Sequence, residues 1–287
     1  MTKNKQPVTI RDRNFAWGEK TYLMGILNVT PDSFSDGGEF NNLEAALAQA
    51  QHLVEAGADI IDIGGQSTRP GAEEISETEE CDRTLPIIAA IRSILSTPIS
   101  IDTTRASVAQ KAIAAGADIV NDISGGTFDP DMFPVVAKLG VPIILMHIRG
   151  TPQTMQKLTD YQDLIGEIYQ FFQTQIDAAL AAGILRSRLI IDPGIGFAKT
   201  CQQNIEILQE LPRFHNLDLP ILIGVSRKSF IGNILNQSNP KSRVWGTAAA
   251  CCSAIASGAD ILRIHDVLEM ADVSRVADTL WRSIPST

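Results

Sequence analysis

The sequence predicts an α/β fold, a single-domain TIM (β/α)8 barrel preceded by a short N-terminal β-hairpin. Eight short apolar segments, counted from Tyr22, alternate with helical segments over about 260 residues, which is the usual length of such a barrel. The segments are apolar throughout, as expected of parallel strands buried on both faces. A doubly wound sheet shows the same alternation, but no GxGxxG motif follows the first barrel strand, and this disfavours the doubly wound sheet.

The first 21 residues are predicted to form an extension with a hairpin, and residues 22–287 are predicted to form the barrel. Val8 and Ile10 alternate with polar residues, and together with Tyr22 they indicate a hairpin over residues 8–22 with Gly18 at its turn. No segment rich in Pro, Ser or Gly divides the remaining chain. The barrel is therefore expected to be undivided.

Each barrel strand is predicted from an apolar run that ends in polar residues. The first run, 22–27, changes at Asn28 into a long polar loop, and the pair Asn41 and Glu44 indicates the start of a helix. A step consisting of a helix ending at Gly, a tight turn and a short strand then occurs three times, as AGADIID, AGADIVND and SGADILRIHD. Strands are predicted in these steps and over 98–101, 141–146, 189–191 and 221–224, with one helix after each.

Composition excludes several classes of function. The 287 residues are 44% hydrophobic with a net charge of −9, which argues against a broad nucleic-acid-binding surface. No run approaches the roughly 18 apolar residues of a membrane span, and the first residues contain no secretory signal. The four cysteines form neither a CxxC pair nor a zinc spacing, which favours a reducing cytosol and a cytoplasmic protein.

Polar side chains follow nearly every predicted strand, and a parallel barrel brings such strand ends to one mouth. We expect this mouth to collect the following residues: Asn28, Thr68, Arg69, Asp102, Asn121, His147, Asp192, Ser226, Arg227, Lys228, Arg263 and His265. One of them alone could be a helix cap or a turn residue. Together, on one rim of an acidic protein, they predict a functional site.

The residue types at this mouth suit two kinds of ligand. Arg69, Arg263 and His265 suit an anion such as a phosphate or diphosphate, and Asn28 offers a hard oxygen to Mg²⁺. The remaining strand-end residues could line a pocket for a flat heterocycle with donors and acceptors: Asp102, Asn121, Asp192 and Lys228. Zinc is disfavoured because the four histidines show no HxH or HExxH arrangement, and His147 is left outside the predicted site.

Seven motifs resemble those of the dihydropteroate synthase family. In chain order they are MGILNVTPDSFSDGG, DIGGQSTRPG, SIDTT, NDISGG, DPGIGFAKT, GVSRKSFIG and RIHD. The resemblance extends from about Tyr22 to the final helix, with Gln66 standing where glutamate is frequent in the family. It implies a TIM barrel that condenses 6-hydroxymethyl-7,8-dihydropterin diphosphate with p-aminobenzoate, giving 7,8-dihydropteroate in folate biosynthesis. It also implies a homodimer.

The resemblance assigns roles by motif. Asn28 would bind Mg²⁺ on the diphosphate, while Arg69, Arg263 and His265 would hold that diphosphate and Thr68 would touch the substrate. The residues that would recognise the pterin are Asp102, Asn121, Asp192 and Lys228. Ser226, Phe197 and Pro70 would shape the p-aminobenzoate slot, for which sulfonamides compete in this family. We expect Arg69, Lys228, Arg263 and His265 to support a dissociative loss of diphosphate without a covalent enzyme intermediate. Loops 29–40 and 65–77 are expected to close over the site.

Two alternatives remain open at this point. A pterin-binding methyltransferase barrel would share the Asp/Asn/Asp pocket, but it would have no diphosphate for the SRKS and RIHD cations to hold. A catalytically inert barrel could act as a binding partner instead, although an intact set of strand-end residues weighs against this alternative.

Overall fold

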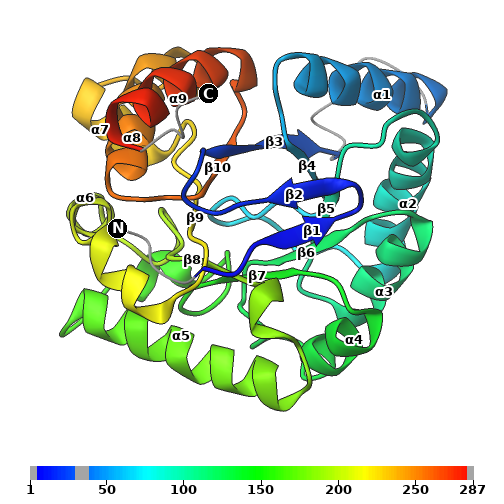
Figure 1. Ribbon diagram of the computed structural model, residues 1–287, viewed down its shortest axis with the longest axis horizontal. Coiled ribbons are helices and arrows are strands. Elements are labelled where there is room, and N and C mark those ends of the chain that lie inside the picture. The colour runs from blue at the N-terminus through cyan, green and yellow to red at the C-terminus, as the bar shows by residue number, and fades with distance from the viewer. Residues whose placement is uncertain (1–4, 30–38, 283–287) are drawn as a thin grey trace.

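Eight parallel strands form the centre of the computed structural model, which describes residues 5–29 and 39–282 (Figure 1). In chain order the strands are β3 (Tyr22–Asn28), β4 (Ile60–Gly64), β5 (Ile99–Asp102), β6 (Ile119–Asp122), β7 (Ile143–Met146), β8 (Leu189–Asp192), β9 (Leu222–Ile223) and β10 (Ile261–Ile264). Their order in the sheet is β8-β7-β6-β5-β4-β3-β10-β9. A parallel bridge between Ile191 and Ile221 joins β8 to β9 and closes the ring. The predicted barrel is confirmed.

Helices surround the ring on its outside (Figure 1). They are α1 (Glu39–Glu55), α2 (Glu77–Ile94), α3 (Ala106–Ala115), α4 (Met132–Leu139), α5 (Leu164–Ala181), α6 (Cys201–Gln209), α7 (Ser229–Leu235), α8 (Val244–Ala256) and α9 (Val267–Trp281). Two helices, α7 and α8, separate β9 from β10, so the expectation of one helix after each strand is wrong there. No described helix is long and apolar enough to span a membrane, and all four cysteines are free.

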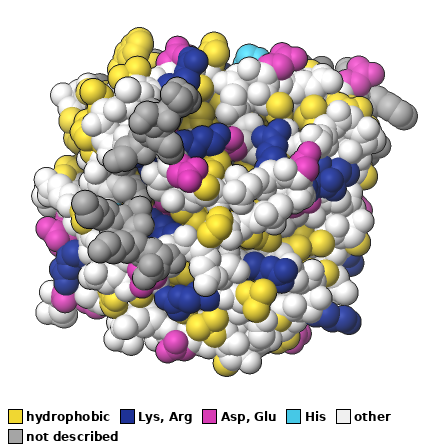
Figure 2. All heavy atoms as spheres, in the orientation of Figure 1, with side chains coloured by type: hydrophobic (Ala, Val, Ile, Leu, Met, Phe, Trp, Pro, Cys, Tyr) yellow, Lys and Arg dark blue, Asp and Glu magenta, His cyan; other side chains and the backbone are white. Residues whose placement is uncertain are grey.

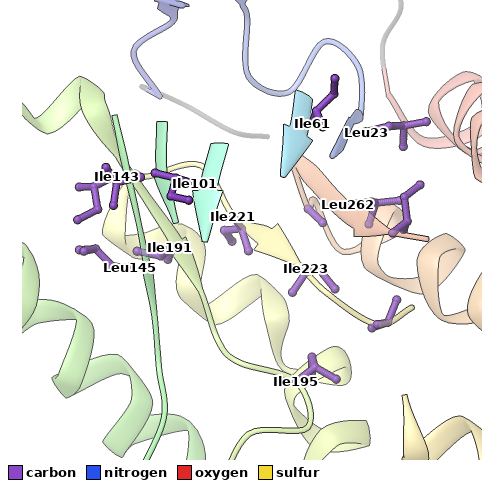
Figure 3. Packing of buried hydrophobic residues seen from close by; sticks show 14 of the residues in the cluster. Leu23, Ile61, Ile101, Ile143, Leu145, Ile191, Ile195, Ile221, Ile223 and Leu262 are labelled. Carbon is purple, nitrogen blue, oxygen red and sulfur yellow. The ribbon is translucent and has the colours of Figure 1, made fainter. Parts of the chain in front are cut away.

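Alternate residues of each strand face the helices and form the main core. Figure 3 labels ten buried side chains of this core, of which Ile221 directly precedes β9 and Ile195 lies in the loop after β8: Leu23, Ile61, Ile101, Ile143, Leu145, Ile191, Ile195, Ile221, Ile223 and Leu262. The other face of several strands carries buried polar residues, among them Asp62, Ser100 and Asn121. The expectation of uniformly apolar strands is therefore wrong. The helix-facing side is apolar except for Asp122 at the end of β6, and the inner side becomes polar toward the carboxyl end of the barrel.

The N-terminal hairpin closes the opposite, amino end of the barrel. It consists of β1 (Val8–Ile10) and β2 (Arg13–Phe15), which pair antiparallel and lie across the ring in Figure 1. Its apolar side chains share a cluster with the first residues of the strands, including Tyr22, Ile60 and Ile261. The hairpin turns at Arg11, which adopts φ +57 while its side chain donates to Asp118, and not at Gly18 as predicted. Gly18 forms a separate turn, at φ +86, between the bridged residues Trp17 and Lys20.

The three repeats AGADIID, AGADIVND and SGADILRIHD, called AD steps after their shared Ala-Asp pair, make the same set of contacts at this amino end. In each, the aspartate carboxylate accepts the backbone N–H of the preceding strand in the ring, and the pairs are Asp59 with Leu23, Asp118 with Ile99, and Asp260 with Ile221. The N–H of each aspartate donates back to the same neighbour. A cation completes each pair: Lys20 at Asp59, Arg92 at Asp118 and Lys5 at Asp260. The steps therefore fasten consecutive strands to one another.

We expect the substitution Asp118→Ala to destabilise the protein. It leaves the buried N–H of Ile99 without its carboxylate acceptor and removes the partner of Arg92, which should cost about 1–3 kcal/mol of unfolding free energy. Urea unfolding would measure the loss. Asp272→Ala, which removes an exposed carboxylate, is the matched control and should change the midpoint little. Equal midpoints for the two variants would contradict this role of the AD step.

Candidate active site

The predicted site residues lie at the carboxyl end of the barrel, because the strands that carry them run parallel. Asn28, Asp102 and Asp192 are the last residues of β3, β5 and β8. Asn121 lies one residue before the end of β6, opposite Asp102 in the register of the sheet. Arg263 lies in β10, opposite Met24 in β3. Among these residues, Asp102, Asn121 and Arg263 form one hydrogen-bonded cluster together with Asp62.

Arg263 is the centre of this cluster. Its Nε donates to Asp62 at 2.6 Å and its Nη2 donates to Asp102 at 2.8 Å, so that one guanidinium joins two carboxylates from β4 and β5. The amide of Asn121 donates to both oxygens of Asp62 at 3.3 and 3.4 Å. Nη1 of Arg263 has no hydrogen-bond partner among the described residues and is available to a ligand.

The charges of this cluster support one another inside the barrel. Burial opposes the charge of the Arg263 guanidinium, but Asp62 and Asp102 raise the pKa of Arg263 above its ordinary value. Burial raises the pKa of Asp102 as well, against the attraction of Arg263, and the neighbouring Asp62 raises it further. The arginine therefore stays charged at every physiological pH, while Asp102 is the group most sensitive to the loss of its partner.

Asp192 and Lys228 form the second part of the site. Oδ1 of Asp192 accepts the N–H of Gly194 at 2.7 Å, which leaves Oδ2 to accept from a ligand. Burial raises the pKa of Asp192 to about 6, opposed by the Gly194 N–H and by Lys228. Burial lowers the pKa of Lys228 to about 8, as does Arg263. Nζ of Lys228 lies over the ring of Phe197, 4.2 Å from its centroid.

Ser226 and His265 form a third part. Nδ1 of His265 lies 2.9 Å from Oγ of Ser226, and the backbone N–H of His265 donates to the same oxygen at 3.1 Å. Burial, with the charges of Arg227 and Arg263, lowers the pKa of His265 to about 3. Without a bound anion the imidazole is thus neutral at pH 7, whereas the sequence analysis treated it as a cation for an anion. Arg227, also expected at the mouth, forms an ion pair with Asp266 through both of its carboxylate oxygens.

Thr68, Arg69 and Pro70 lie on the loop after β4, outside the buried cluster. Thr68 is half-buried, while Arg69 and Pro70 are exposed. Thr68 and Asp102 line one cavity of about 130 Å³ beside the mouth. The side chain of Gln66 donates to the Glu73 carbonyl at 2.8 Å and accepts the Ile75 N–H at 2.9 Å. A glutamate, which is frequent at this position in the family that the motifs resemble, could not make the first of these bonds when ionised.

This loop also contacts the loop after β7, since the N–H of Gly71 donates to the Pro152 carbonyl at 3.1 Å. The loop predicted to close over the site from β3 includes residues 30–38, which lie outside the described residues.

The chemistry of Asn28 fits a magnesium ion that arrives with a phosphate ligand. Its amide supplies one neutral hard oxygen at a half-buried strand end. Among the described residues no cluster of three or more His, Cys, Asp or Glu side chains could hold a metal ion by itself. Mg²⁺ commonly takes one or two protein oxygens and completes its octahedron with phosphate and water. The donor set is therefore compatible with Mg²⁺ bound jointly with a substrate.

Sequence reasoning missed one central residue, Asp62. It is fully buried, at 0% exposure, in the middle of the apolar run IIDIG and does not lie at a strand end. A signal was present, because a lone carboxylate inside an otherwise apolar strand needs a cationic partner. Lys199, which is buried beside His147, was also not singled out.

Comparison with known proteins gives a consistent result. The family model described as pterin binding enzyme matches residues 24–265. A dihydropteroate synthase of Synechocystis sp. is 62% identical over 276 residues, which are 96% of this chain and 96% of that protein. A Xanthomonas albilineans dihydropteroate synthase with 4-aminobenzoic acid superposes with a TM-score of 0.90 at 40% identity, covering 97% of this chain and 98% of that one. The Xanthomonas enzyme in complex with 7,8-dihydropteroate gives a TM-score of 0.87 at 38% identity, covering 96% and 98%.

The parallel barrel and the polar cluster at its carboxyl end thus have the form of a pterin-binding enzyme, the class whose model spans most of the chain. Within that class the chain belongs to the dihydropteroate synthase family of transferases. The family resemblance carried by the seven motifs is confirmed.

We expect Asp62→Asn to lower turnover while the protein stays folded. The change removes the charge that fixes Nε of Arg263, and a poorly placed guanidinium should reduce kcat by roughly tenfold to a hundredfold. Ser100→Ala is a matched control, because Ser100 is equally buried, lies opposite Asp62 in the sheet and has no side-chain hydrogen bond. Steady-state release of pyrophosphate would measure kcat. An unchanged kcat in folded Asp62→Asn protein would refute the positioning role.

Proposed function

We propose that this chain condenses (7,8-dihydropterin-6-yl)methyl diphosphate with p-aminobenzoate to give 7,8-dihydropteroate and diphosphate, with Mg²⁺ and by dissociative loss of diphosphate. The observation that carries the proposal is the half-buried Arg263, which joins the buried Asp62 and Asp102 beside Asn121 at the carboxyl end of the barrel. Related structures that hold 4-aminobenzoic acid and 7,8-dihydropteroate support the choice of the second substrate and of the product.

The pterin is held by Asp102, Asn121, Asp192 and Lys228 in this proposal. A pterin presents an aminopyrimidine edge that donates hydrogen bonds, and the free Oδ2 of Asp192 is an acceptor for such donors. Asn121 uses its Nδ2 on Asp62, so its carbonyl oxygen is left to accept a further donor. The ammonium of Lys228 can donate to a ring nitrogen or to the exocyclic oxygen.

The reaction needs no activated nucleophile on the protein. The bond between the pterin methylene and the diphosphate oxygen breaks, and the diphosphate leaves with the electron pair. The electron-rich pterin stabilises the methylene cation until the amine nitrogen of p-aminobenzoate adds to it and then releases its proton. Charge therefore develops on the leaving group, where preorganised donors contribute most.

Arg69, Arg263 and His265 face this developing charge. Nη1 of Arg263 is available, and the exposed Arg69 lies on a loop that can approach the mouth. The neutral imidazole of His265 can donate one N–H to an oxygen of the diphosphate in the tautomer in which the Ser226 hydroxyl donates to Nδ1 and Nε2 carries the proton. A bound dianion raises the pKa of such a histidine, so that His265 can also take up a proton when the diphosphate leaves.

Asn28 is the residue that would hold Mg²⁺ together with the diphosphate. When bound there, Mg²⁺ supplies charge neutralisation to the leaving oxygens. Ser226, Phe197 and Pro70 are placed beside the p-aminobenzoate in this proposal, and Thr68 touches it from the loop after β4. Phe197 is the only one of these four that contacts Lys228 in the described part of the chain, through its ring.

Turnover with both substrates tests the proposal. We expect pyrophosphate release that requires p-aminobenzoate, stops with EDTA and returns with Mg²⁺. Asn28→Ala should raise the half-saturating Mg²⁺ concentration by about tenfold, because it removes the protein oxygen. Asn14→Ala, an exposed position in β2 at the opposite end of the barrel, should behave as wild type.

Other outcomes favour the alternatives. Binding of the pterin diphosphate without any release of pyrophosphate would favour an inert barrel, and methyl transfer from a methylated pterin would favour a methyltransferase. An Asn28→Ala enzyme with unchanged Mg²⁺ dependence would refute the assignment of Asn28 alone.

We also propose that the protein is a homodimer that pairs through its last helices. Large hydrophobic side chains are exposed on α8 and α9, with Trp245 at 76% and Leu280 at 66% exposure, and they are accompanied by Leu268, Val276 and Trp281. Hydrophobic atoms gather over these helices at the upper left of Figure 2, whereas the rest of that face mixes both signs of charge. An exposed apolar patch of this kind is typical of an interface between subunits.

Sedimentation of the wild-type protein at micromolar concentration should give a dimer, and Trp245→Asp should shift it toward the monomer. Lys241→Asp, which places the same carboxylate at an exposed position just before α8, is the control. A wild-type monomer under these conditions would contradict the proposal.

A further inference from the structure

Lys199 is a buried cation to which the proposed reaction assigns no role. It lies in the loop between β8 and α6, directly before the helix cap Thr200, and only 4% of it is exposed. Its Nζ lies 2.9 Å from the Phe197 carbonyl, 3.0 Å from Nδ1 of His147 and 3.4 Å from the His147 carbonyl. An ammonium group has three N–H donors, and here it faces three acceptors. A fully satisfied ammonium accounts for its burial without a direct carboxylate partner.

These contacts fix the protonation of His147. When Lys199 is an ammonium group its Nζ can only donate, so Nδ1 of His147 accepts, and the imidazole is the neutral tautomer with its proton on Nε2. Burial, with the charges of Lys199 and Arg149, holds the pKa of His147 well below its ordinary value. Burial also lowers the pKa of Lys199 to about 7, against the attraction of Asp192, so three donors are present below that pH.

The backbone around Lys199 is shaped for this contact. Ala198 adopts φ +53, a left-handed conformation that is uncommon for alanine, and this turn allows the lysine to fold back onto the carbonyl of Phe197. Gly194 approaches His147 so closely that a Cβ there would lie 2.0 Å from the His147 carbonyl oxygen. Lys199 thus joins the loops after β7 and β8, in addition to the Gln156 amide that donates to the Gly196 carbonyl at 3.5 Å.

The joined segment leads directly into the proposed site. The Phe197 carbonyl contacts Lys199, and the Phe197 ring contacts Lys228 on its other side. At Gly196 a Cβ would lie 3.1 Å from Cδ of Lys228, so the loop backbone itself passes against that lysine. A shift of the loop would therefore move Phe197 and the side chain of Lys228 together.

We propose that Lys199 is a positioning residue whose bonds to His147 and to the Phe197 carbonyl set the place of the Phe197 ring, and with it the p-aminobenzoate side of the site. This inference rests on the proposed function, because it takes Phe197 as part of the p-aminobenzoate slot. Two of the side chains that are proposed to hold the pterin, Asp102 and Asn121, lie on β5 and β6 away from this loop, whereas Asp192 and Lys228 contact it. The loss of Lys199 should therefore affect the two substrates unequally.

Kinetics of Lys199→Met test this inequality. The methionine fills a similar volume but donates nothing, so KM for p-aminobenzoate should rise by about tenfold or more, while KM for the pterin diphosphate should rise several-fold less, because Asp102 and Asn121 stay in place. Lys138→Met, an exposed lysine in α4, is the matched control and should change neither value. A thermal melt checks that the variants are folded. If folded Lys199→Met raises both KM values equally, or neither, the positioning role is refuted.

A second measurement does not depend on turnover. Nitrogen-15 NMR of the histidine rings should show His147 protonated on Nε2 in the wild type, and the Nδ1 resonance should move in Lys199→Met and not in Lys138→Met. A wild-type His147 protonated on Nδ1 would overturn the proposed positioning by Lys199 even if the enzyme is active. A wild type with the expected tautomer and no synthase activity would instead refute the proposed function and leave the contact between Lys199 and His147 established.

Discussion

The site depends on one arrangement of charges, the half-buried Arg263 guanidinium between the buried carboxylates of Asp62 and Asp102. Removing three charged groups from water is costly, and well-packed hydrophobic residues would stabilise a barrel interior as well or better. The arrangement is therefore better explained by a role in the candidate site than by a contribution to the stability of the fold. It holds a permanent cation in a fixed orientation, with one nitrogen directed away from both carboxylates. Such preorganisation is valuable only where charge develops during a reaction.

The contacts that stabilise the barrel and the polar residues of the candidate site lie at opposite ends of the barrel axis. At the amino end the inner layer is apolar and is covered by the hairpin, and the aspartates of the AD steps fasten neighbouring strands there. At the carboxyl end the same strands carry Asp62, Asn121 and Asp192 on their inner face. Because the two ends share only the strands, the polar end can accommodate ligands without loosening the apolar end.

The sequence was sufficient for the fold and for the strand-end residues, because both follow from short-range patterns. Strands that stop at Asn28 or Asp192 are visible as abrupt changes of polarity. Pairings between distant segments are not visible in this way. Nothing near Asp62 in the chain shows that Arg263, 201 residues away, will neutralise it. For the same reason the sequence could not show that Arg227 forms an ion pair with Asp266, or that burial and neighbouring cations keep the His265 imidazole neutral.

The balance of charge at the mouth has a consequence for the binding of an anion. The buried carboxylates Asp62, Asp102 and Asp192 are matched by the cations Lys199, Lys228 and Arg263, so this part of the site is close to neutral before a ligand binds. In the proposed reaction a diphosphate would add negative charge that Lys228 and Arg263, whose charge neighbouring carboxylates already offset, would only partly balance. Further positive charge would have to come from outside the cluster, from the exposed Arg69, a proton on His265 and the proposed Mg²⁺. A neutral amide at Asn28 suits this balance better than a carboxylate, because a carboxylate would itself consume the charge that the leaving group needs.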